Sequence, residues 1–107
     1  RLTLPTDFQS APDRRRSVIH KNIGDIQECY ERELGQGVNM TGQVLLRWLV
    51  GSDGSVTSVS VEADTLPRRR TSECMVERIR TWRFPKPHGG PAQVVFPFWF
   101  KGSSESQ

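Results

Sequence analysis

The sequence predicts a single α+β domain with the element order αββαβ, in which a three-stranded sheet of antiparallel type carries two helices on one face. Two observations predict this class. Apolar residues alternate within 44–50 and 94–100, as they do in strands, and recur at steps of three and four within 19–34 and 75–82, as they do in amphipathic helices. A chain of 107 residues is long enough for one domain and not for two.

The ends of the chain differ from its centre. Residues 1–12 show no sustained period and are interpreted as a linker or extended lead-in, residues 13–101 as the domain, and residues 102–107 as a flexible polar tail. The chain begins at Arg1 rather than Met and shows no signal peptide, so we expect it to be a piece of a longer protein. Any targeting or anchoring segment would then lie outside it.

The first helix is expected to begin near Ser10–Asp13, where the spacing resembles a capping box, and to end at Gly35. Cys29 lies on the flank of its apolar stripe. The residues of that stripe are Ile19, Ile23, Ile26, Tyr30 and Leu34.

A β-hairpin follows. From Gly42 the period is two, with Val44, Leu46, Trp48 and Val50 on one side and Gln43, Leu45, Arg47 and Leu49 on the other, and the turn Gly51–Gly54 leads to a second strand over 56–61. Because Val56 and Val59 differ in parity, the sequence predicts a bulge near Thr57–Ser58.

The second helix and the last strand complete the domain. Met75, Val76, Ile79 and Trp82 have helical spacing, and the helix must stop before Pro85. In the last strand, Val94, Phe96, Phe98 and Phe100 point one way, and Val95, Pro97 and Trp99 the other. A proline lacks the N–H that a ladder needs, which favours an edge strand. A right-handed crossover through the second helix makes the hairpin's first strand central.

The two cysteines leave two alternatives open, namely a pair of buried reduced thiols or one disulfide. A zinc site is poorly supported, because only His20 and His88 could join Cys29 and Cys74 as ligands. The predicted fold sets the two helices side by side, each with its cysteine near the shared core, which favours a Cys29–Cys74 disulfide. Such a bond would stabilise the fold by roughly 4 kcal/mol in the chain-entropy view and persist outside the reducing cytosol.

The side of the sheet away from the helices carries the candidate partner-binding residues. Leu45, Leu49, Val95 and Trp99 form an apolar patch on it that is larger than a monomer usually exposes. The patch is a binding surface, or the lead-in with Leu2, Leu4 and Phe8 folds back over it, or it is an ordinary exposed face. The last strand, with Val94 and Phe98, also offers an edge for strand addition, which Pro97 and Lys101 partly defend.

Charge and catalytic motifs give weaker signals. The net charge is +3, and acidic residues interleave with the arginine runs Arg14–Arg16 and Arg68–Arg70, as on solvated helix faces. The alternative is a polyanion-binding module that uses these arginines, although nucleic acid is not the expected partner. His20 lacks a nucleophile partner and His88 lies in a Pro/Gly loop, so we expect neither an enzyme nor a cofactor. Strand-exchanged homodimers remain a further possibility.

Several short motifs, taken in order, resemble the C-terminal domain of TonB-type energy transducers, and within that group the AgmX/PglI-like C-terminal family of gliding bacteria. The resemblance covers about Ser17 to Lys101. The matching residues are Cys29–Glu31, Gly42–Val44, Asp53–Val56, Thr65–Leu66, Cys74, Trp82–Pro85 and Phe96–Phe100.

This resemblance implies a periplasmic domain that is tethered to an inner-membrane anchor and motor by a long spacer. It implies contact with an outer-membrane or other envelope protein, and transmission of work derived from the proton gradient in transport or gliding motility. In the TonB group a short peptide of the partner adds to the last strand, and Val94–Phe100 is the matching position here.

Overall fold

The computed structural model describes residues 2–3, 14–34 and 40–102. Its elements in chain order are β1 (Leu2–Thr3), α2 (Arg14–Lys21), α3 (Ile23–Glu31), β2 (Gly42–Val50), β3 (Val56–Asp64), α4 (Arg69–Ile79) and β4 (Ala92–Phe100).

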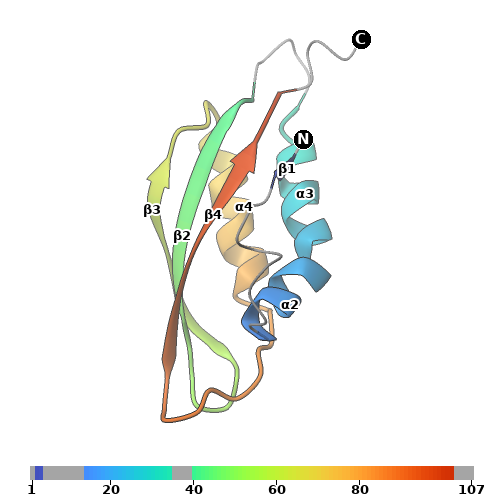
Figure 1. Ribbon diagram of the computed structural model, residues 1–107. Helices are drawn as coiled ribbons and strands as arrows, with labels where there is room; N and C mark the ends of the chain where they lie inside the picture. The colour runs from blue at the N-terminus through green and yellow to red at the C-terminus, as the bar shows by residue number, and fades with distance from the viewer. Residues whose placement is uncertain (1, 4–13, 35–39, 103–107) are drawn as a thin grey trace.

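The sheet has the strand order β1-β4-β2-β3, and every neighbouring pair is antiparallel (Figure 1). The three long strands are the predicted ones, and the central position of β2 is confirmed. The α+β class is confirmed as well.

One prediction about the sheet is wrong at the end of β4. We expected the last strand to be an edge strand, but β1 pairs with it on the side away from β2, with Leu2 opposite Phe100 and Thr3 opposite Trp99. Within residues 2–3, the described part of this segment, the pairing covers these two positions, and Pro97 lies two residues before them in β4. Part of the predicted lead-in is therefore a strand.

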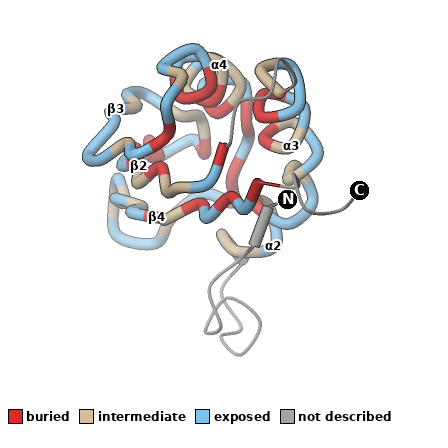
Figure 2. The backbone as a smooth tube through the Cα atoms, turned by 90° about the horizontal axis from the view of Figure 1, so that it is seen from above, coloured by how far each residue is buried: buried red, intermediate tan, exposed pale blue. Residues whose placement is uncertain are grey.

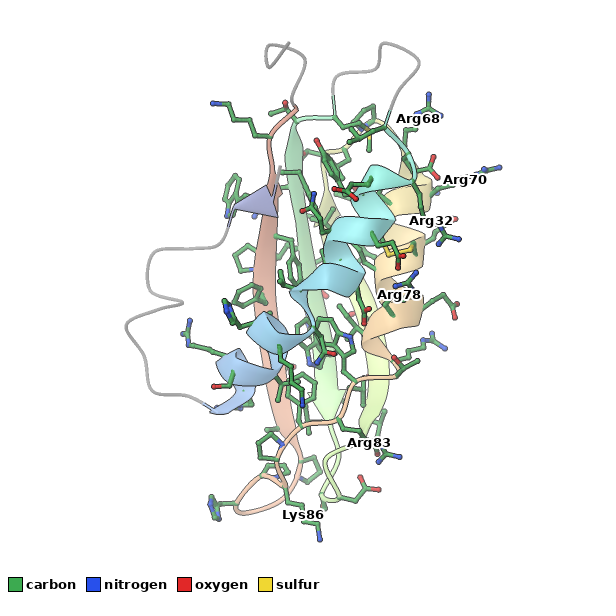
Figure 3. The ribbon with its side chains drawn as sticks, turned by 90° about the vertical axis from the view of Figure 1, so that its right-hand side faces the viewer. Arg32, Arg68, Arg70, Arg78, Arg83 and Lys86 are labelled. Atoms are coloured by element: carbon green, nitrogen blue, oxygen red, sulfur yellow. A yellow bond between two sulfur atoms is a disulfide. The ribbon has the colours of Figure 1, made fainter. Side chains whose placement is uncertain are left out.

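The described helices lie in a layer on one face of the sheet, here called the inner face, as Figures 2 and 3 show. The first predicted helix is divided at Asn22, whose side-chain amide donates to the Val18 carbonyl oxygen at 2.9 Å. The Asn22 backbone N–H donates to the same carbonyl at 3.0 Å and to the Ile19 carbonyl oxygen at 3.2 Å, and these bonds hold the residue where α2 turns into α3. The expected start at Ser10–Asp13 and the closing Gly35 lie outside the described residues.

The core lies between the helices and the inner face. Trp48 on β2 is at its centre, with the rings of Trp82 and Phe84 each 6.1 Å away between centroids. Helix α4 ends at Ile79, so Trp82 follows the helix rather than belonging to it. Trp82 and Phe84 pack the chain after α4 against the sheet, as the sequence predicts.

Two bulges interrupt β3 where it pairs with β2. One falls at Thr57, because Val50 pairs with Val56 while Leu49 pairs with Ser58, and this confirms the prediction from valine parity. The second falls at Glu62, between the partners of Leu45 and Leu46, and was not predicted. Bulges bend the strand and raise its local twist.

The hairpin turn is fastened to the segment after α4. The Phe84 backbone N–H donates to the Gly54 carbonyl oxygen at 2.8 Å, and Gly54 has a φ of 91°. A Cβ at this position would collide with the Phe84 carbonyl oxygen. In the same turn, the Ser55 backbone N–H and hydroxyl donate to the Asp53 carboxylate at 3.0 and 2.7 Å, which lowers the pKa of Asp53.

We expect Gly54→Ala to lower the free energy of unfolding by about 3 kcal/mol, because a left-handed backbone and a backbone collision both oppose the side chain. Gly89→Ala is the matched control. Its φ of 78° is also left-handed, but an added Cβ meets nothing within 4 Å. Its expected cost is only about 1 kcal/mol. Equal costs in chemical denaturation would show that the Phe84 contact does not restrict the turn.

Candidate protein-interaction site

The outer face of the sheet carries an exposed apolar patch over β2 and β4. We call Leu45, Leu49, Val95 and Trp99 the outer patch. Leu49 is 38% exposed, Val95 49% and Trp99 47%, and Leu45 is half-buried. The alternation of β2 and β4 makes this face, since Leu46, Trp48, Phe96 and Phe98 are buried on the inner face. The structure therefore brings together the four residues that the sequence placed there.

The outer face is apolar on one side only. Along β4, Val95 and Trp99 flank the half-buried Pro97. On the other side, Arg47 of β2 forms an ion pair with Glu62 of β3 at 2.8 Å, and the Ser60 hydroxyl donates to Glu62 at 3.3 Å. The apolar surface thus borders β4 and its edge, not β3.

Val94 and Phe98, also predicted to bind a partner, point the other way. Phe98 is fully buried and Val94 packs against the core. Their side chains stabilise the inner face, so only their backbone groups could take part in strand addition. Of the lead-in residues that could cover the patch, Leu2 lies in β1 at the sheet edge, while Leu4 and Phe8 lie outside the described residues.

A disulfide joins Cys29 of α3 to Cys74 of α4, with the two Cα atoms 5.6 Å apart. The disulfide alternative of the sequence analysis is thereby confirmed, and the reduced-thiol alternative is wrong for this structure. Cys29 is fully buried, Cys74 is half-buried, and the Arg32 Nη1 lies 3.5 Å from the Cys74 Sγ.

Further contacts attach α3 to α4 and to the sheet. Asp25 accepts a hydrogen bond from the Trp82 indole at 3.1 Å and lies 3.4 Å from the Arg78 guanidinium. At the other end of α3, the Tyr30 ring stacks on Phe100 with 4.5 Å between centroids, and its hydroxyl donates to the Met40 carbonyl oxygen at 2.8 Å. One end of α3 is thus held to α4 and the segment that follows it, and the other end to the end of β4.

The arginines of the helical layer are mixed with carboxylates. Arg78 pairs with Glu28 at 2.7 Å, and Arg68 lies 4.0 Å from Glu33. Figure 3 shows Arg32, Arg68, Arg70 and Arg78 along the α3–α4 side, with Arg83 and Lys86 toward the opposite end of the molecule. This distribution favours a solvated helix face over a continuous basic stripe for phosphates.

The described residues give little support for other kinds of site. Within 2–3, 14–34 and 40–102, histidine, cysteine and acidic side chains form no group of three or more suited to a metal ion. His88 is exposed in its loop. Among the helices described, none has the length and hydrophobicity needed to cross a bilayer.

Comparisons with protein-family models, with curated proteins and with solved structures found no match for this chain. The resemblance to TonB-type domains therefore stays a prediction. Two of the motifs quoted for it are in contact, since Asp53–Val56 lies against Trp82–Pro85 through the Gly54–Phe84 hydrogen bond and a β-bridge between Ser55 and Arg83.

We expect reduction of the disulfide to lower the free energy of unfolding by about 4 kcal/mol, because the cross-link closes a long loop in the unfolded chain. The measurement is chemical denaturation of the protein with and without dithiothreitol. The Cys29→Ala/Cys74→Ala variant is the control, since it should be insensitive to the reductant. An unchanged midpoint with both thiols free would show that the bond adds no stability.

Proposed function

We propose that this domain is a non-enzymatic, periplasmic protein–protein interaction module of a TonB-like envelope protein. It docks an extended apolar segment of an outer-membrane or other envelope protein, and it transmits proton-gradient-derived force to that partner in transport or gliding motility. The segment lies along β4 and covers the outer patch.

The exposure of the outer patch is the observation that carries this proposal. Trp99 and Val95 each keep about half of their surface in water, at 47% and 49%, although the inner face of the same strand is buried. Burying large apolar side chains is favourable by roughly 25 cal/mol per Å². A partner that covers such a patch gains this free energy, whereas the isolated domain does not.

The edge of β4 supports the mode of docking. The described residues pair with this edge only at Trp99 and Phe100, through β1, so an added strand can pair along Ala92–Phe98. Pro97 removes one donor there, which limits pairing with arbitrary strands. Hydrogen bonds to the backbone would provide affinity, and contacts with Val95 and Trp99 would provide specificity.

The disulfide supports both the compartment and the mechanical role. A Cys29–Cys74 bond is consistent with an oxidising compartment such as the periplasm. A domain under load fails at a rate set by its unfolding barrier, not by its equilibrium stability. A covalent bond between α3 and α4 opposes the separation of these helices while the partner pulls on the sheet.

We expect Trp99→Lys to abolish capture of the partner from a solubilised envelope fraction while the thermal midpoint stays within a few degrees of the wild type. The substitution replaces the largest apolar side chain of the outer patch with a charged one at an exposed position. Ser17→Lys is the matched control, because it adds the same charge at an exposed position of α2, in the helical layer. If Trp99→Lys captures the same proteins as the wild type, the docking surface lies elsewhere.

Salt dependence separates this proposal from polyanion binding by the arginine runs. Apolar docking should survive a rise from low to physiological salt, whereas binding to phosphate-type polymers weakens steeply, by orders of magnitude when many contacts are made. Capture that disappears with salt and is unaffected by Trp99→Lys would support the polyanion alternative.

A further inference from the structure

The opposite edge of the sheet has a groove that the outer patch does not include. β3 is the last strand of the sheet within the described residues, and α4 lies beside it on the inner face (Figures 1 and 2). The residues that line the groove between them are Val61, Asp64, Arg69, Ser72, Glu73, Val76 and Glu77.

Val61 is exposed although it belongs to the inner face. It pairs with Leu46, which is fully buried, yet 42% of Val61 remains accessible because α4 does not extend over it. Val76 of α4 is half-buried on the other wall. The two valines therefore make facing walls of the groove apolar. The groove adjoins the edge of β3 that has no partner strand within the described residues.

The rim of the groove is acidic. Asp64, Glu73 and Glu77 contribute three carboxylates against the single guanidinium of Arg69. Within the described part of the chain, neither Glu73 nor Glu77 forms an ion pair. Both are exposed on α4 above the two valines.

We propose that this groove binds an extended basic peptide, which adds as a strand to the free edge of β3. Its lysine or arginine side chains enter the groove with their aliphatic stems on Val61 and Val76, and their charged ends reach Glu73 and Glu77. The bulges at Thr57 and Glu62 limit regular pairing to Ser58–Val61. The recognised stretch is thus short, and its alternate residues face the serines of the outer face.

A second copy of the domain fits this edge less well. Pairing two β3 edges around a two-fold axis would set the two α4 helices next to each other, with Glu73 and Glu77 of both copies at the junction. Like charges so placed oppose association. A cationic segment has the complementary charge, and this is why the groove is assigned to it.

The experiment uses three blocked hexapeptides that alternate threonine with lysine, glutamine or glutamate, and measures binding at low salt by fluorescence anisotropy. We expect the lysine peptide to bind at least about tenfold more tightly than the glutamate peptide, with the glutamine peptide between them. Amide shifts in NMR should centre on Ser58–Val61. Equal binding of the three peptides, or shifts confined to β4, would overturn the proposal.

Two variants test the groove itself. Glu73→Lys/Glu77→Lys should reverse the preference, so that the glutamate peptide binds more tightly. Val61→Lys should weaken binding of the lysine peptide about tenfold or more, because it removes an apolar wall of the groove and places a cation beside the same carboxylates. All three positions are exposed, so the fold should persist, and circular dichroism checks this.

Trp99→Lys separates this groove from the function proposed above. It should leave binding of the lysine peptide unchanged, because Trp99 lies on the outer face of β4, with β2 between it and β3. If Trp99→Lys weakens binding of the lysine peptide as much as Val61→Lys does, the peptide binds the outer patch and the groove proposal is wrong. A negative result for the groove would not affect the proposed docking of an envelope partner at the outer patch. A negative result for the outer patch would likewise not affect the groove proposal.

Discussion

The alternation of side chains along β2 is the constraint on which the domain depends. β2 pairs on both sides, so the direction of its side chains fixes the inner and outer faces of β3 and β4 as well. Val44, Leu46, Trp48 and Val50 are fully buried, and the intervening residues cannot be. A slip of one residue would expose Trp48 and bury Arg47. The helical layer, the outer patch and the Arg47–Glu62 ion pair all follow from this register.

Specific contacts, in addition to apolar packing, hold the helices of this layer together and attach them to the sheet. The disulfide joins α3 to α4, Asp25 joins α3 to Trp82, and Tyr30 joins α3 to the end of β4. The hydrogen bond of Asp25 and the ring contact of Tyr30 must break when α3 separates from the rest of the domain, whereas the disulfide keeps α3 joined to α4.

Much of the fold could be predicted from the sequence because its signals are local. The period of two along 44–50 predicts β2, and the parity of the valines predicts the Thr57 bulge. The apolar stripes of the two helices place Cys29 and Cys74 near the same core. The break at Asn22 could not be predicted, because the pattern of apolar residues continues across it and a side-chain hydrogen bond decides the geometry. Nor could β1, since two residues have no period. The outer patch could be predicted from the alternation of side chains along the strands. The groove could not, because Val61 has the parity of a core residue and only the placement of α4 leaves it exposed.

The two edges of the sheet differ in chemistry, and this decides what each can bind. The β4 edge adjoins an apolar outer face, is interrupted at Pro97 and already pairs with β1 at its end. The β3 edge adjoins serines on the outer face and, on the inner face, the carboxylates of Glu73 and Glu77 on α4, and bulges confine its regular part to four residues. A strand with cationic side chains would meet carboxylates at the β3 edge, whereas the β4 edge offers an apolar surface. Because β2 hydrogen-bonds to both strands, ligands on the two edges would be connected through the backbone of one central strand, and a load applied at one edge would pass directly to the other.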